Sequence, residues 1–219
     1  MIPVYINNRN RLTTTRALVE YLRQIPQAAP TIVDNASSYL PLLSWYESCP
    51  VPVVRLETNE GPRAPWQAMD LSGVDYYVVT DSDLDLPGVP IDVLDVLQRG
   101  LEEFPWAVKC GLSLRIDDIP EGYRFKPHVI AHETKYWSDR INAQFYRADI
   151  DTTFAMYRVN PAWQGDYGPS LRTAEPYTAR HVPWYAVEPY DEEEWYYLDH
   201  ATCSGIFWSV MAREHEREQ

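Results

Sequence analysis

Short apolar runs alternate with helical patterns through the first half of this 219-residue chain, and this alternation constrains the fold more than any other feature. The strongest run, residues 76–80, reads Tyr-Tyr-Val-Val-Thr, a composition that favours a strand. Apolar residues then recur every three or four positions across residues 91–104, as they do on one face of a helix. Strands that alternate with helices are typical of βαβ units and of a mainly parallel sheet.

The same reading along the chain predicts further elements. The expected strands are residues 2–6, 31–33, 51–56, 76–80, 106–116, 145–146 and 152–159, and the expected helices are 13–25, 39–47, 65–69 and 91–104. Beyond residue 117 the periodicity weakens, and residues 160–179, rich in Pro, Gly and Thr, are expected to form a long ordered loop over the site. We therefore expect an α/β fold with a mainly parallel central sheet flanked by helices, and a smaller mixed or antiparallel C-terminal part.

Charge and cysteine content limit the classes of function. The net charge is −13, from 19 basic and 32 acidic residues, and a field of this sign repels a nucleic-acid backbone, so we expect no nucleic-acid partner. The three cysteines, Cys49, Cys110 and Cys203, are widely spaced and odd in number, which favours reduced thiols and a cytoplasmic location. No run approaches the ~20 apolar residues of a membrane helix, so the chain is not expected to span a membrane. Nothing in the sequence indicates an oligomeric state.

Polar clusters follow four of the expected strands. They are Asn7-Asn8-Arg9, Asp34-Asn35, Glu57-Thr58-Asn59 and Asp81-Ser82-Asp83. Ligands of open parallel sheets bind outside the carboxyl ends of the strands, so these clusters are expected to converge on one crevice. Asp81 and Asp83 are suited to a hard cation, because Mg²⁺ or Mn²⁺ is commonly held by one or two carboxylates together with substrate phosphates. The alternative is an acidic turn that caps the next helix, but the apolar strand directly before the motif favours a site.

The order of these clusters resembles that of GT-A glycosyltransferases, especially the family-2-like group. The resemblance covers residues 1–116, and it implies one GT-A domain, 1–219, with a nucleotide-sugar-binding half, 1–116, and an acceptor-binding half, 117–219. It also implies a nucleotide-diphosphate sugar as the donor and Mn²⁺ or Mg²⁺ as the cofactor.

The resemblance further assigns roles to individual residues. Asp34 would contact the base or ribose, Asn59 to Arg63 would lie by the nucleotide and diphosphate, and Asp81 would bind ribose and metal. Asp83 would be the more direct metal ligand. Asn7 and Arg9, at the end of the first strand, are placed in the same donor site.

Two departures from the family pattern concern the chemistry. Pro62 and Pro65 interrupt a stretch where the family often begins a helix, and the family's catalytic base is not obvious. Asp149 and Asp151 are the candidates for a base that deprotonates the acceptor hydroxyl. The alternative reading places both at a strand edge facing solvent, and the choice between retention and inversion at the sugar stays open.

Four further features belong to the second half of the chain. His181 is a candidate third metal ligand by resemblance to several GT-A enzymes, with a purely structural histidine as the alternative. Arg172 and Arg180 suit phosphate oxygens or surface acids equally well. Glu192-Glu193-Glu194 is expected to be a solvated acidic face. The aromatic residues of a candidate acceptor site, which could instead fix the loop to the sheet, are Trp163, Tyr167, Tyr177, Trp184 and Tyr185.

The expected function is therefore that of a metal-dependent, hexosyltransferase-like glycosyltransferase that acts on a glycan, lipid or small-molecule acceptor. A nucleotidyltransferase of the same fold would carry a Gly-rich phosphate loop after the first strand, and Asn7 to Arg11 contain no glycine. The other alternative is a sugar-nucleotide-binding protein without turnover.

Overall fold

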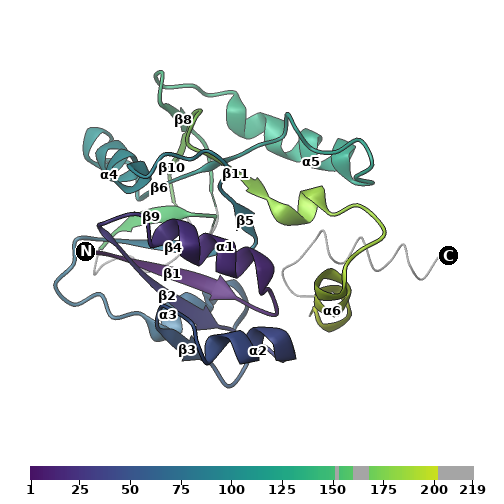
Figure 1. Ribbon diagram of the computed structural model, residues 1–219. Coiled ribbons are helices and arrows are strands. Elements are labelled where there is room, and N and C mark those ends of the chain that lie inside the picture. Colours follow the sequence, from purple (N-terminus) through teal and green to yellow (C-terminus); the bar gives the residue numbers. More distant parts are fainter. Residues whose placement is uncertain (151–152, 160–167, 202–219) are drawn as a thin grey trace.

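The computed structural model describes residues 1–150, 153–159 and 168–201, and its central feature is an eight-stranded sheet of order β3-β2-β1-β4-β9-β6-β10-β8 (Figure 1). A smaller sheet has the order β5-β11-β7. The strands of the large sheet are β1 Ile2–Asn8, β2 Ala28–Asp34, β3 Val53–Arg55, β4 Tyr76–Asp81, β6 Lys109–Gly111, β8 Phe145–Arg147, β9 Ala155–Arg158 and β10 Ser170–Thr173. Those of the small sheet are β5 Leu84–Asp85, β7 Ser113–Leu114 and β11 Thr178–His181.

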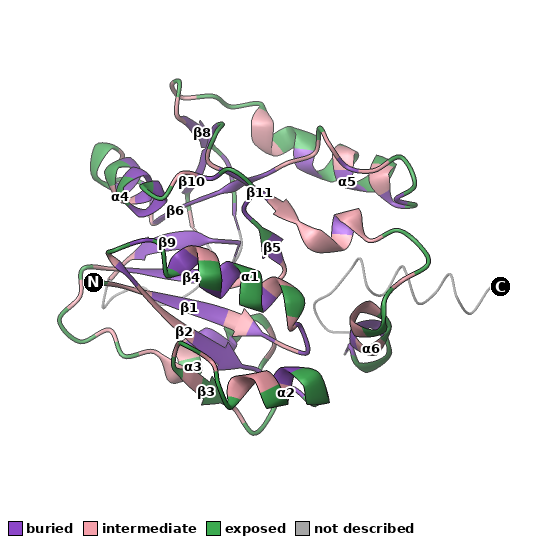
Figure 2. Ribbon diagram, in the orientation of Figure 1, coloured by how far each residue is buried: buried purple, intermediate pink, exposed green. Residues whose placement is uncertain are grey.

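Helices flank the large sheet on both faces. The α-helices are α1 Thr13–Leu22, α2 Leu40–Tyr46, α3 Ala64–Ala68, α4 Val93–Glu103, α5 Lys126–Glu133 and α6 Glu192–His200, and the 3₁₀ turns are η1 Gly61–Arg63, η2 Thr134–Trp137 and η3 Val182–Tyr185. Alternate side chains of β1 explain the two layers: Val4 and Ile6 join the core under α1 and α4, whereas Tyr5 packs with Ala64 of α3. Both faces of the central strands are therefore buried, as Figure 2 shows.

The expected fold class is confirmed. Strands β3, β2, β1 and β4 are parallel neighbours, and β6 and β10 are parallel as well. The strand expected within residues 152–159 is β9, which runs antiparallel between β4 and β6. Among the described residues, no helix has the length and apolar content needed to cross a membrane. Cys49 and Cys110 are both free thiols, and Cys203 lies outside the described residues.

The structure differs from expectation in three respects beyond residue 105. The strand expected at 106–116 is two strands, because the chain leaves the large sheet after Gly111 and joins the small one at Ser113. The loop expected at 160–179 contains β10 and the start of β11, while residues 160–167 lie outside the described ranges. Helices α5 and α6 were not expected, because the apolar spacing that marks α1 and α4 is weak in both.

Candidate functional site

The carboxyl ends of β1 and β4 bring Asp83 to the edge of the large sheet. Asn7 and Asp81 are register partners, and the Ser82 amide donates to the Asn7 carbonyl at 3.2 Å. The chain then enters β5, whose Leu84 pairs with His181 of the antiparallel β11, and the Val182 amide donates to the Asp83 carbonyl at 2.9 Å. This backbone pairing carries His181 to Asp83, with 3.4 Å between His181 Nε2 and Asp83 Oδ2.

The Asp83 side chain is mostly buried and its carboxylate is charged. Its side chain is 17% exposed, and Oδ1 is buried with no hydrogen-bond donor among the described residues. Burial by itself raises the pKa of Asp83, but His181 and the Arg11 guanidinium outweigh it, so the pKa is lowered and the carboxylate is charged at neutral pH. A buried, charged oxygen without a donor is costly, and a divalent cation would compensate it.

The part of the chain that the structure describes does not bring together a complete set of protein ligands for a metal. Asp81 ends β4 and is partly exposed. Within residues 1–150, 153–159 and 168–201, no three His, Cys, Asp or Glu side chains are close enough together to hold a metal. The Asp83–His181 pair fits a cation that takes its remaining ligands from substrate phosphate and water, as Mg²⁺ usually does. The assignment of Asp81, Asp83 and His181 to the metal stays a prediction.

Arg11 is a further residue of this site that the sequence reading did not single out. Its guanidinium forms an ion pair with Glu194 of α6 and lies 3.6 Å from the ring centroid of Tyr197 on the same helix. Arg11 is almost fully buried, and its positive charge contributes to the lowered pKa of Asp83. Its partners lie more than 180 residues away, so no local pattern marks it.

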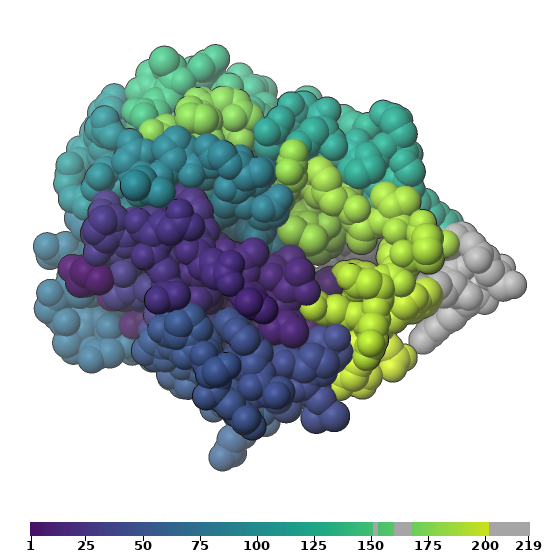
Figure 3. Space-filling view, viewed as in Figure 1, coloured from purple at the N-terminus to yellow at the C-terminus, as the bar shows by residue number. Residues whose placement is uncertain are grey.

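Helix α6 packs across the loops that follow β1 and β2. The Glu193 carboxylate accepts from the Leu12 amide at 3.0 Å and from the Thr13 amide at 3.1 Å, so it caps the start of α1. Tyr196 donates to Ser38 Oγ at 3.0 Å. The space-filling view shows this C-terminal segment lying against the N-terminal part of the chain (Figure 3). The prediction that residues 192–194 are a solvated face is therefore wrong for Glu193 and Glu194, which bind groups of the N-terminal half.

A polar network fixes the loop that was expected near the diphosphate. Asn7 Nδ2 and Asn35 Nδ2 both donate to the Gly61 carbonyl, at 3.3 and 2.9 Å, and the Glu60 amide donates to Asn35 Oδ1 at 2.7 Å. Asn59 Oδ1 accepts from the Gly61 amide, where φ is +63°, a conformation that glycine adopts readily. The loop is thereby tied to the ends of β1 and β2. Arg63, which follows it, is exposed.

Two other predicted donor ligands make internal hydrogen bonds. Asp34 is fully buried, and its oxygens accept from the Ser37 amide at 3.2 Å and the Tyr46 hydroxyl at 3.0 Å. Arg9 donates to the carbonyls of Asn35 and Ala36, at 2.8 and 3.1 Å. Both residues therefore shape the loop after β2, and their contact with a nucleotide stays a prediction.

Arg172 lies inside the protein, next to α5. It donates to Glu133 Oε2 at 2.7 Å and to the Asp149 carbonyl at 2.7 Å, and its guanidinium lies 4.1 Å from the ring centroid of Tyr136. The sequence left Arg172 with two possible roles, binding to phosphate or pairing with a surface acid. The structure shows that Arg172 pairs with an acid, and that this acid is buried. The Asp149 side chain is exposed, and Asp151 lies outside the described residues, so a catalytic base at either position stays a prediction.

Asp118 joins the segment after β7 to β11 and η3. Arg180, the other arginine considered for phosphate, donates to Asp118 Oδ2 at 2.8 Å, and the Tyr185 hydroxyl donates to Oδ1. Arg115 is a further cation 3.6 Å from the same carboxylate. Burial acts to raise the pKa of Asp118, but these hydrogen bonds and charges lower it overall.

This lowered pKa predicts a specific loss of stability in acid. The folded pKa of Asp118 lies below the ordinary value of about 3.9 in the unfolded chain. Its contribution is therefore complete above that value and disappears as pH falls through the folded pKa. We expect the difference in free energy of unfolding between wild type and Asp118→Asn to be constant from pH 7 to about pH 5 and to shrink below about pH 4. Urea unfolding at each pH measures it, and a difference that grows in acid would contradict the assignment.

Comparison with known proteins finds similar solved structures but no similar family or curated sequence. No protein-family model matches the sequence, and no curated protein matches it significantly. Similar solved structures include glucosyl-3-phosphoglycerate synthase from Mycobacterium tuberculosis in complex with Mn²⁺ and uridine-diphosphate-glucose, at 14% identity and a TM-score of 0.47. The same enzyme in complex with phosphoglyceric acid matches at 12% identity and a TM-score of 0.47. Each match covers 72% of this chain and 56% of the solved chain, so this chain matches little more than half the length of that enzyme.

Proposed function

We propose that this protein is a metal-dependent glycosyltransferase that moves a sugar from a nucleotide-diphosphate sugar to a hydroxyl-bearing acceptor. The observation that carries the proposal is the Asp83–His181 pair, 3.4 Å apart at the carboxyl end of the central sheet. One buried Asp83 oxygen has no donor among the residues that the structure describes. Ligands of open α/β sheets bind at this edge. A carboxylate and an imidazole are both acceptable ligands for Mn²⁺.

The charge of the chain supports a metal at this position. At a net charge of −13, the protein would repel a diphosphate, and Arg11 is already paired with Glu194. A divalent cation bound by Asp83 and His181 would neutralise the diphosphate as it leaves. The fixed loop from Asn59 to Gly61, with exposed Arg63 beside it, would then hold the nucleotide.

The proposed transfer is a substitution at the anomeric carbon of the donor sugar. The acceptor oxygen forms a bond to that carbon, and the bond from carbon to diphosphate oxygen breaks, with its electron pair leaving on the diphosphate. The acceptor proton passes to a base, for which Asp149 and Asp151 remain the candidates from the sequence.

A thermal-shift screen tests the donor class. UDP, GDP, CDP and dTDP and their sugars, including uridine-diphosphate-glucose, are each added with and without Mn²⁺. A ligand at about 100 times its dissociation constant adds roughly 2.7 kcal/mol to the free energy of unfolding, so we expect a rise in Tm with one nucleotide family only when Mn²⁺ is present. No shift with any of them would contradict the proposal. If the protein binds the donor but neither transfers the sugar nor slowly hydrolyses the donor, it is a sugar-nucleotide-binding protein instead.

A further inference from the structure

A cavity of about 330 Å³ opens between two segments from the second half of the chain. One wall comes from residues 122–125, and the other from residues 186–188 and Tyr190. Its volume is at the lower end of the range for small-molecule sites, so it fits one ring-sized ligand. It is distinct from the donor loop around Gly61, and the proposed function does not use it.

The two walls are held in a fixed arrangement. The first continues from β7 and the second from β11 and η3, and β7 and β11 are parallel neighbours in the small sheet. The Asp118 contacts with Arg180 and Tyr185 tie the same two stretches together ahead of the cavity. The cavity is therefore formed by the fold before any ligand arrives, which reduces the cost of ordering on binding.

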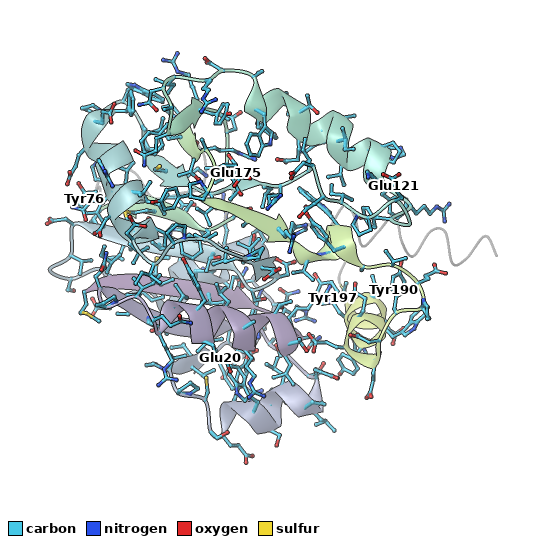
Figure 4. All side chains as sticks on the ribbon, turned by 45° about the horizontal axis from the view of Figure 1, so that its top comes forward. Glu20, Tyr76, Glu121, Glu175, Tyr190 and Tyr197 are labelled. Carbon is cyan, nitrogen blue, oxygen red and sulfur yellow. The ribbon has the colours of Figure 1, made fainter. Side chains whose placement is uncertain are left out.

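The second wall of the cavity follows His181 closely along the chain. The second wall begins at Ala186, directly after η3, which itself begins where β11 ends at His181. Tyr123 of the first wall and Tyr190 of the second line the same cavity, and Tyr190 lies two residues before the start of α6 at Glu192. Helix α6 in turn contacts the N-terminal half of the chain through the ion pair between Glu194 and Arg11. Figure 4 shows Tyr190 and Tyr197 at the same end of the molecule.

The chemistry of the walls favours an uncharged ring that carries hydroxyl groups. Tyr123, Phe125 and Tyr190 supply aromatic surface, and the Tyr123 and Phe125 rings hold each other edge to face at 6.0 Å. Arg124 and Glu188 supply one charge of each sign, which suits hydrogen bonds to hydroxyls and gives no net attraction for an ion. Aromatic faces pack well against the apolar side of a sugar ring.

We propose that the cavity between residues 122–125 and 186–190 binds the acceptor as a single uncharged sugar ring. The identification of this sugar as the acceptor rests on the proposed function. The binding of a sugar in the cavity is independent of that function. The sequence suggested five other aromatic residues for the acceptor site, of which Trp163 and Tyr167 lie outside the described residues. In this proposal Tyr123 and Tyr190 are the aromatic residues that contact the sugar.

Two substitutions change this cavity in different ways. Tyr190→Leu removes one aromatic wall but keeps an apolar side chain. Gly122→Val adds volume where a Cβ would already be 3.1 Å from Val187 Cγ1, so it narrows the cavity. Tyr76→Leu is the matched control, because Tyr76 is partly buried like Tyr190 and begins β4 at the opposite end of the molecule (Figure 4).

Saturation-transfer NMR on the full chain, without donor or metal, tests the proposal. The probes are methyl β-D-glucopyranoside, methyl β-D-galactopyranoside, methyl α-D-mannopyranoside and N-acetylglucosamine. We expect ring protons of at least one probe to receive saturation from the wild type, and its affinity to fall about tenfold or more in Tyr190→Leu and Gly122→Val but not in Tyr76→Leu. Circular dichroism checks that each variant is folded.

The outcomes separate this proposal from the donor proposal. Loss of sugar binding in both cavity variants, with Mn²⁺-dependent nucleotide binding intact, supports both proposals. The same loss in a protein that binds no nucleotide supports a sugar site but not a transferase. No signal from any probe, or equal signals from wild type and folded Tyr190→Leu, would overturn the cavity assignment even where the nucleotide binds.

Discussion

Replacing Asp83 with Asn is expected to lower the Mn²⁺-dependent affinity for nucleotide by about 100-fold or more while leaving the protein folded. The substitution keeps the size of the side chain but removes the charge that a cation requires. Loss of groups that only support a metal ligand already costs 10- to 100-fold, so loss of a direct ligand should cost at least as much. Isothermal titration with nucleotide, at fixed Mn²⁺ and without it, measures the change.

Asp85→Asn is the matched control for this experiment. Asp85 lies two residues further on, in β5, and its half-exposed side chain is 3.5 Å from Arg180. We expect this variant to bind nucleotide like the wild type, because an exposed ion pair contributes little and Asp85 is not beside His181. Wild-type affinity in Asp83→Asn, with Mn²⁺ present, would remove Asp83 from the metal site.

The first half of the fold was predictable because its signals are local. Strands β1, β2 and β4 are buried on both faces, so they appear in the sequence as apolar runs, and α1 and α4 show the spacing of one buried face. The polar residues that end these strands follow from the same reading. The proximity of Asp83 and His181 does not, since it depends on the pairing of the two-residue strand β5 with β11. Only the family resemblance placed these two residues in one site.

The second half was harder to predict because its contacts join distant parts of the chain. Three successive glutamates indicate an exposed face when the sequence is read locally, but Glu193 and Glu194 bind groups beside α1. Arg11 likewise has no marking pattern, although it links α6 to Asp83 electrostatically. Arg172 was compatible with phosphate or with an acid, and only the tertiary structure shows that the acid is the buried Glu133.

The ion pair between Arg172 and Glu133 predicts the largest effect on stability. Their side chains are 6% and 4% exposed, with 2.7 Å between Arg172 Nη1 and Glu133 Oε2. Arg172→Leu leaves the Glu133 carboxylate buried without its partner, which costs about 3–5 kcal/mol of unfolding free energy. Urea unfolding at pH 7 measures this loss. As a control, the exposed Arg99→Leu in α4 should change stability by less than about 0.5 kcal/mol.

The double variant Glu133→Leu/Arg172→Leu tests whether the loss of stability comes from an unpaired buried Glu133 carboxylate or from the lost attraction within the ion pair. A buried ion pair can often be replaced by apolar residues of similar volume without loss, because both desolvation costs are removed together. We therefore expect the double variant to recover most of the stability lost in Arg172→Leu. Nucleotide binding should also be retained in the double variant, since Arg172 faces Glu133 and Tyr136. A double variant as unstable as the single one would show that Arg172 stabilises the fold through its bond to the Asp149 carbonyl instead.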